Sequence, residues 1–88
     1  MSDAFTVNEA ASRFEWQEGA DTAHARYRLK GKILYIEYVE APPALRGTGA
    51  AGRLMGAIQH YAQGQHYDIV PICGYAAAWL NRHGTPSA

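Results

Sequence analysis

The sequence predicts an α+β fold, a compact mixed α/β layout with a mostly antiparallel sheet, a β-α-β crossover and two helices. Three observations predict it. Apolar and polar residues alternate in residues 13–17 and 23–30, as in strands, and the apolar spacing becomes helical after position 50. A short strand-like run then precedes a second helical segment. We expect residues 1–88 to form a single domain, because a chain of this length fills one modest core.

The first thirty residues contain three predicted strands. We expect a short strand at 5–7, a turn at 8–11 and a second strand at 13–17. In residues 23–30 apolar side chains alternate with basic ones, so one face should pack on the core while the other is solvated. Lys30-Gly31 then indicates a hairpin, because glycine supplies the positive φ of a tight turn.

Residues 32–40 form the longest strand-like run, with bulky apolar or aromatic groups on both faces. A strand covered on both sides has this pattern, so we place it centrally in the sheet. The segment Ala41-Pro42-Pro43-Ala44 ends the strand, because proline has no N–H to continue the ladder.

A helix follows, and Gly64 is its expected C-terminal end. Residues 69–73 then form a strand and 75–82 a second helix, which 84–86 should end. The strand–helix–strand unit is expected to be a right-handed crossover with its two strands parallel. The first helix is predicted from one apolar stripe, which consists of Ala51, Leu54, Met55, Ile58 and Ala62.

Charge and cysteine content exclude several classes of protein. Eight basic residues balance eight acidic ones, so nothing indicates a polybasic nucleic-acid binder. Cys73 is the single cysteine, which excludes an internal disulfide and a thiolate metal cluster. No stretch approaches the roughly 18 apolar residues of a membrane span, and we expect a reduced, cytoplasmic protein. The four histidines lack metal-ligand spacing, so no metal site is predicted: His24, His60, His66 and His83.

The segment Arg46-Gly47-Thr48-Gly49 comes after the long strand and opens the long helix. A helix N-terminus has about four unpaired N–H groups and a partial positive charge, and together they attract anions. Glycine at both positions lets a ligand approach the backbone, while Arg46 adds a donor fork suited to phosphate. The alternative is a tight loop that uses glycine only to turn. On the residues alone, the pattern favours a phosphate or diphosphate site.

Two common nucleotide-binding motifs fit less well. The P-loop pattern G-x-x-x-x-G-K-[ST] is absent. The stretch from Gly47 to Gly52 matches G-x-G-x-x-G formally, but it does not follow a first strand, and Asp68 begins no obvious ribose-binding strand end. We therefore do not favour a dinucleotide site.

The loop and its flanks resemble the GNAT acetyltransferase superfamily, and in particular its small YjdJ-type members. Arg46-Gly47-Thr48-Gly49-Ala50-Ala51 matches the superfamily signature R/Q-x-x-G-x-G/A. The subfamily often has histidine where this chain has Tyr38. The resemblance covers nearly the whole chain and includes Asn8 with Phe14-Glu15, the run from Ala41 to Ala51, and Pro71-Ile72-Cys73-Gly74-Tyr75 followed by Trp79 and Arg82-His83.

The resemblance implies that the chain binds acetyl-CoA as a co-substrate. The loop from Arg46 to Ala51, with Gly47, Thr48, Gly49 and Ala50 between, would hold its diphosphate. The pantetheine arm would lie along the splayed end of the long strand, near Val39 and Ala41. Cys73 and Tyr75 would stand close to the thioester or the arm.

Three residues are candidates for catalysis. Cys73 precedes a helix, whose N-terminus favours a thiolate, but a lone cysteine is often only a small buried apolar residue. Tyr75 is a candidate proton donor to the leaving thiolate, or it packs in the core. Glu37 would share an otherwise apolar strand face with Ile33, Tyr35 and Val39, which makes it a candidate base, although an exposed edge carboxylate fits the same pattern.

The leading hypothesis is an acetyl-CoA-dependent N-acetyltransferase that acts on an unidentified amine, as a monomer or weak homodimer. A non-catalytic acyl-CoA-binding or sensing module is the second hypothesis, favoured by the small size and by Tyr38 in place of histidine. The third is a protein-interaction domain that has kept the fold without the ligand. No nucleic-acid or membrane partner is expected.

Overall fold

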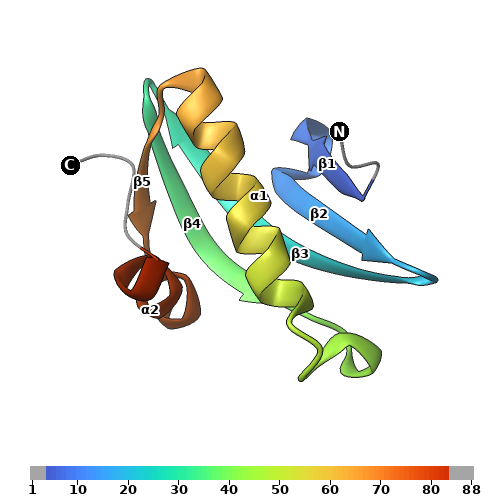
Figure 1. Ribbon diagram of the computed structural model, residues 1–88. Coiled ribbons are helices and arrows are strands. Elements are labelled where there is room, and N and C mark those ends of the chain that lie inside the picture. The colour runs from blue at the N-terminus through green and yellow to red at the C-terminus, as the bar shows by residue number, and fades with distance from the viewer. Residues whose placement is uncertain (1–3, 84–88) are drawn as a thin grey trace.

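A computed structural model describes residues 4–83, which form one sheet and two helices on it (Figure 1). The α+β class and the order of elements predicted from the sequence are confirmed. The predicted helix end at 84–86 lies outside the described residues. The elements are β1 (Phe5–Asn8), the 3-10 turn η1 (Glu9–Ala11), β2 (Arg13–Glu18), β3 (Asp21–Lys30), β4 (Ile33–Glu40), the 3-10 turn η2 (Pro43–Leu45), α1 (Ala50–Gln65), β5 (Asp68–Pro71) and α2 (Gly74–His83).

The strands follow the chain order β1-β2-β3-β4-β5 across the sheet. The first four are antiparallel, and β5 pairs with β4 in parallel, as the crossover through α1 predicts. Gly31 has φ +61° between Lys30 and Ile33, which pair across the predicted hairpin. The antiparallel part is therefore formed by local hairpins and the parallel part by the long helix.

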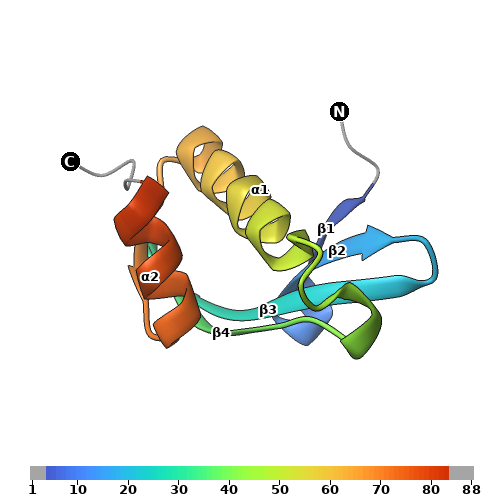
Figure 2. The same cartoon turned by 60° about the horizontal axis from the view of Figure 1, so that its bottom comes forward.

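Both helices cover the same face of the sheet (Figure 2). Phe14 is fully buried there, and its ring stacks on Tyr27 at 4.4 Å and meets Tyr61 of α1 edge-on at 5.6 Å. The apolar stripe predicted for α1 is buried on this face, except that Ala51 is only half-buried. From α2, Ala76, Trp79 and Leu80 complete the core.

The opposite face of the sheet is not covered within residues 4–83, so the expectation that β4 is covered on both sides is wrong. Ile33 and Tyr38, on this face, are 39% and 41% exposed. Charged side chains shield part of the apolar surface there, since the Arg28 guanidinium lies 4.8 Å from the centre of the Tyr35 ring. Bulky residues on both faces of β4 thus reflect aromatic–arginine packing on the open side.

A β-bulge interrupts the pairing of β3 with β4. Arg26 pairs with Tyr38, and the next residue, Tyr27, pairs with Ile36, so Glu37 has no partner across the ladder. The extra residue reverses the alternation of faces. Val39 consequently packs against the core while Glu37 points to the open face, so the expectation that they share a face is wrong.

Helix α1 ends one residue beyond the expected stop at Gly64. His66 adopts the left-handed conformation with φ +61°, and its N–H donates to the carbonyls of Ala62 and Gln63. The N–H of Tyr67 also donates to Ala62 at 2.8 Å, and its ring lies 6.2 Å from that of Tyr61. This aromatic contact fixes where the chain leaves the helix, which explains why the glycine is not used.

Strand β5 is shorter than predicted because the chain turns away from β4 after Pro71. The N–H groups of Ile72 and Cys73 both donate to the carbonyl of Ile36, at 2.9 and 3.1 Å. Helix α2 begins immediately afterwards at Gly74. The last four residues of β4 therefore have no partner on the β5 side within the described chain.

Candidate functional site

The loop from Arg46 to Gly49 connects η2 to α1, and its two glycines adopt conformations that other residues avoid. Gly47 has φ +79° and Gly49 has φ +88°. Gly49 is the N-cap of α1 and provides no side chain to bond the first turn. The sequence thus begins its longest helix with a left-handed glycine, where a serine or aspartate cap is common.

The N–H groups around this helix start divide into two sets. Those of Arg46, Thr48 and Ala50 are paired, with Pro43 O, Leu45 O and Thr48 Oγ1 respectively. Three of the N–H groups between positions 46 and 51 are therefore already paired within the protein. The other set donates to no acceptor within residues 4–83, and it comprises Gly47, Gly49, Ala51 and Gly52.

An open cavity of about 380 Å³ lies against the unpaired set. This volume is within the range of roughly 300–1,000 Å³ typical of small-molecule sites. Arg46 is the one charged residue in its lining. The partial positive charge of the α1 N-terminus adds to it, so the cavity favours an anion. Its lining consists of Ala41, Leu45, Arg46, Gly47, Gly49, Ala51, Gly52 and Tyr75.

Arg46 ties this loop to the end of the long strand. Its Nε donates to the carbonyl of Ala41 at 3.0 Å. Because a guanidinium has five N–H donors, that bond uses one of them. Arg46 therefore holds the loop beside the segment of β4 that has no β5 partner, which includes Val39.

Tyr75 and Cys73 lie at the start of α2, and only Tyr75 lines the cavity. Tyr75 is 39% exposed, and its hydroxyl lies 3.7 Å from the position that a Cβ on Gly52 would occupy. Cys73 is half-buried, packs against the core, and accepts the N–H of Ala77 at its carbonyl. Both residues thus follow the point where β5 leaves β4.

Comparison with known families decides the identity of this fold and loop. Residues 13–87 match the GCN5-related N-acetyl-transferase family. The chain belongs to this family. The matched span includes the loop, the cavity and both helices, so the GNAT resemblance of the sequence is confirmed. Membership of the YjdJ-type subgroup stays a prediction, and no curated protein matches the chain.

The GCN5-related domain does not bring Glu37 to the cavity. The bulge directs this carboxylate to the open face, where it lies 3.7 Å from Arg26 and 3.9 Å from Arg28. The other carboxylate near the end of β4 belongs to Glu40, and its Oε1 lies 3.8 Å from Nε2 of His24. Carboxylates at the end of β4 are therefore engaged with the basic residues of β3, away from the cavity lining.

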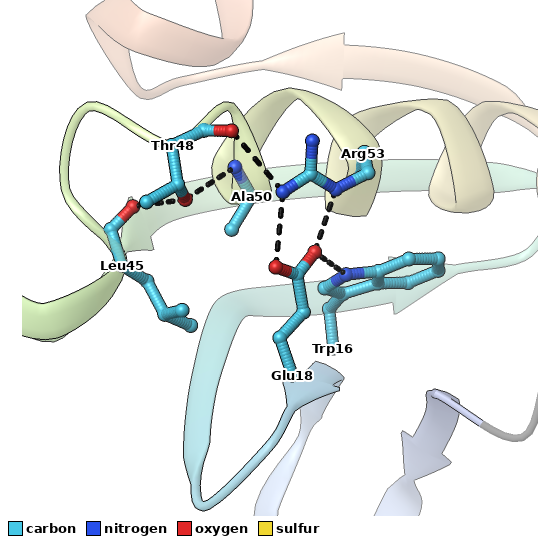
Figure 3. Close-up of polar contacts among 6 residues, drawn as sticks. All are labelled: Trp16, Glu18, Leu45, Thr48, Ala50 and Arg53. Atoms are coloured by element: carbon cyan, nitrogen blue, oxygen red, sulfur yellow. Dashed lines mark hydrogen bonds and ion pairs between the residues drawn. The ribbon is translucent and has the colours of Figure 1, made fainter.

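Sequence reasoning missed two features of the site. Gly52 lines the cavity, and a side chain there would meet Trp79 Nε1 at 3.4 Å. Arg53, which lies outside the apolar stripe of α1, bonds Glu18 of β2 through two nitrogens, at 2.6 and 3.0 Å (Figure 3). The Arg53 hydrogen bond, followed by that of Trp16, lowers the pKa of Glu18. The glycine spacing was a usable signal for Gly52, whereas nothing local indicates the Glu18–Arg53 pair.

Two further findings concern classes of partner. Among the described residues, no helix has the length and apolarity needed to cross a membrane. Residues 4–83 also contain no group of three histidine, cysteine or acidic side chains placed to hold a metal ion.

Proposed function

We propose that this acetyltransferase domain binds acetyl-CoA at the α1 N-terminus and transfers the acetyl group to an amine. The observation that carries the proposal is the set of unpaired N–H groups at Gly47, Gly49, Ala51 and Gly52, which face an open cavity beside Arg46. A diphosphate offers several oxygens that accept hydrogen bonds, and family membership favours coenzyme A as its carrier.

The glycines support this proposal sterically. A Cβ on Gly49 would lie 3.1 Å from Arg53 Nη1, and one on Gly52 would contact Trp79 and Tyr75. Their absence leaves room for phosphate oxygens to reach the backbone. The residues present therefore fit a diphosphate, with Thr48 and Ala50 closing the loop internally.

The pantetheine arm would run from the loop along the free end of β4. After Ile36 this strand has no β5 partner within the described residues, so its edge near Val39 is open to an extended ligand, which would reach Ala41 where that carbonyl already accepts from Arg46 Nε. An amide-bearing arm can form strand-like hydrogen bonds with such an edge. An arm placed in this way would run from the α1 N-terminus toward the point where β5 leaves β4, next to Cys73.

Acetyl transfer from a thioester to an amine forms a C–N bond, breaks the C–S bond, moves one proton from nitrogen and delivers one to sulfur. Tyr75, exposed at the cavity, is the proposed proton donor to the thiolate. Cys73 is proposed to line the site at the acetyl end. An acetylated Cys73 intermediate is the alternative, and it predicts a labelled thiol in the absence of amine.

One observation favours a second candidate function, a non-catalytic acyl-CoA-binding module. The cavity lining contains no carboxylate and no histidine, so within the described residues no side-chain base stands at the site. Such a module would bind coenzyme A without transferring the acetyl group.

Two measurements separate these proposals. Calorimetric titration with coenzyme A should give heat of binding, and no heat together with no change in Tm at millimolar coenzyme A would contradict both. Isotope-labelled acetyl-CoA with a panel of amines should then give labelled amide. For Tyr75→Phe we expect kcat to fall by about a hundredfold with unchanged coenzyme A affinity, the lower range for losing a general acid. Binding with no label on any amine or on Cys73 would support the module.

A further inference from the structure

Glu18 and Arg53 connect the far end of β2 to the first turn of α1, across 35 positions of sequence. Arg53 Nε donates to Glu18 Oε2 at 2.6 Å, and Arg53 Nη2 donates to Oε1 at 3.0 Å, which is a two-point arginine–carboxylate pair (Figure 3). Trp16 Nε1 also donates to Oε2 at 2.7 Å and so fixes the carboxylate from below. The orientation of the guanidinium is therefore set by strand β2.

The same guanidinium holds the glycine loop. Arg53 Nη2 donates to the carbonyl of Thr48 at 3.2 Å. The Thr48 hydroxyl donates to Leu45 O at 2.6 Å and accepts from the N–H of Ala50 at 3.3 Å. The residue before Gly49 is thus fixed through both its side chain and its carbonyl.

This arrangement determines where the N–H of Gly49 points. In a planar trans peptide, the carbonyl of one residue and the N–H of the next point in opposite directions. Because Arg53 holds the carbonyl of Thr48, the N–H of Gly49 is directed away from Arg53. Gly49 lines the cavity, and its N–H has no acceptor within residues 4–83. Glycine is also favoured here, because φ is +88° and a Cβ would lie 3.1 Å from Arg53 Nη1.

We propose that Glu18 is a positioning residue for the diphosphate site: it orients Arg53, which holds the Thr48 carbonyl and thereby aims the N–H of Gly49 into the cavity. The inference rests on the proposed binding of coenzyme A. It assigns a role in ligand binding to a carboxylate, although a carboxylate repels the anion that the site is proposed to bind.

Because of that repulsion, the two possible roles of Glu18 predict opposite changes in coenzyme A affinity when its charge is removed. If Glu18 acted on the ligand only through its charge, Glu18→Gln would strengthen coenzyme A binding, because a negative charge near an anion is removed. If Glu18 positions the loop, Glu18→Gln weakens binding, because a neutral amide holds the guanidinium less firmly and the Gly49 N–H loses its fixed direction. Whether coenzyme A affinity rises or falls in Glu18→Gln therefore distinguishes the electrostatic role from the positioning role.

Glu15 provides a matched control on the same strand. It pairs with Arg13 at 3.0 Å and points to the opposite side of β2 from Glu18, since its neighbours Phe14 and Trp16 pack toward the core. Glu15→Gln removes the same charge and also breaks an arginine pair, but it leaves Arg53 in place. Any loss of affinity from a general weakening of β2 or from altered net charge should occur in both variants.

The experiment measures coenzyme A affinity by calorimetry for the wild type, Glu18→Gln, Glu15→Gln and Arg53→Lys. We expect Glu18→Gln to bind coenzyme A about fivefold more weakly than the wild type, which is the effect of one hydrogen bond. The affinity of Glu15→Gln should stay within about twofold of wild type. Arg53→Lys keeps the positive charge without the planar fork, so it should lose affinity as Glu18→Gln does. Pantetheine, which lacks the diphosphate, should bind the wild type and Glu18→Gln equally.

A second readout needs no ligand. Amide hydrogen exchange at Thr48 and Ala50, whose N–H groups are hydrogen-bonded within the loop, should become faster in Glu18→Gln and remain unchanged in Glu15→Gln, because the loop loses its anchor only in the first. Unchanged exchange at the loop, or coenzyme A affinity equal to or tighter than wild type in Glu18→Gln, would overturn the inference. Should the wild type itself fail to bind coenzyme A, the proposed function is contradicted separately, and the exchange measurement still decides whether Glu18 anchors the loop.

Discussion

The two ends of helix α1 are built in opposite ways. At the C-terminal end, the N–H groups of His66 and Tyr67 bond the last carbonyls and aromatic rings cover the turn. At the N-terminal end, a left-handed Gly49 takes the place of a side-chain cap, and four N–H groups donate to nothing within residues 4–83. One end satisfies its own backbone, whereas the other is left open beside a cavity.

The difference fits the proposed function, in which the same helix serves stability at one end and ligand binding at the other. Leaving out a capping side chain costs stability, and a side chain there would fill the place proposed for the ligand. At the closed end no such need exists, and even a non-glycine residue, His66, takes the left-handed position. Substitutions should therefore affect the two ends in different measurements.

The largest effect is expected from the middle of the helix, which supports both ends. Ile58 is fully buried against the sheet. Ile58→Ala should lower the free energy of unfolding by about 2–5 kcal/mol, the usual cost of truncating a core side chain and leaving a cavity. Urea denaturation measures this. A loss well under 1 kcal/mol would mean that α1 is not packed as described.

The next effect concerns ligand binding at the open end. Gly52 lines the cavity, whereas Gly56, one turn later, has no atom within 4 Å of its Cβ position. Gly52→Leu should weaken coenzyme A binding at least about tenfold, or roughly 1.4 kcal/mol, because the side chain occupies the cavity. Gly56→Leu should leave affinity unchanged. Equal affinities for the two variants in calorimetry would place the ligand elsewhere.

A smaller effect compares the two left-handed residues directly. Gly49→Ala should destabilise the fold by about 1–2 kcal/mol, since an L-residue pays that cost in the left-handed region. His66→Gly should instead stabilise it by at most about 1 kcal/mol and leave coenzyme A binding intact. Thermal melting of Gly49→Ala and His66→Gly tests these two predictions. If His66→Gly lowered Tm, the histidine side chain would have a stabilising role that the backbone does not explain.

The smallest effect is the pH dependence contributed by Glu18. Its pKa is lowered, chiefly by the hydrogen bond from Arg53, so its contribution to stability is present above the ordinary glutamate pKa of about 4.3 and is lost as the pH falls through the lower folded value. The difference in Tm between wild type and Glu18→Gln should therefore be present at neutral pH and shrink below about pH 4. A difference that stays constant under acid conditions would contradict the pairing.

Local patterns predicted the strands, the helices and the glycine loop, because alternation, helical spacing and left-handed glycines are properties of short segments. The loop at Arg46 to Gly49 was found this way, and its family resemblance was confirmed. The bulge at Glu37 was not predictable, because it depends on how β4 pairs with Tyr27. That pairing decides which face each side chain takes, so the position of Glu37 away from the cavity could not be known from spacing.

Contacts between segments that are distant in the sequence could not be predicted from local patterns either. Glu18 and Arg53 are brought together only when β2 lies under the start of α1. The sequence indicated Gly64 as the end of α1, but the helix runs to Gln65, and the ring of Tyr67 contacts that of Tyr61 just beyond it. Which N–H groups stay unpaired depends in the same way on the folded course of the loop.

Coenzyme A titration followed by amide NMR tests the central claim most directly, because it observes the proposed donors themselves. We predict that the amide signals of Gly47, Gly49, Ala51 and Gly52 shift most, that the signal of His66 at the closed end does not move, and that pantetheine leaves the glycine signals in place. Shifts confined to the open face of the sheet, or glycine amides that stay unmoved at saturating coenzyme A, would contradict it.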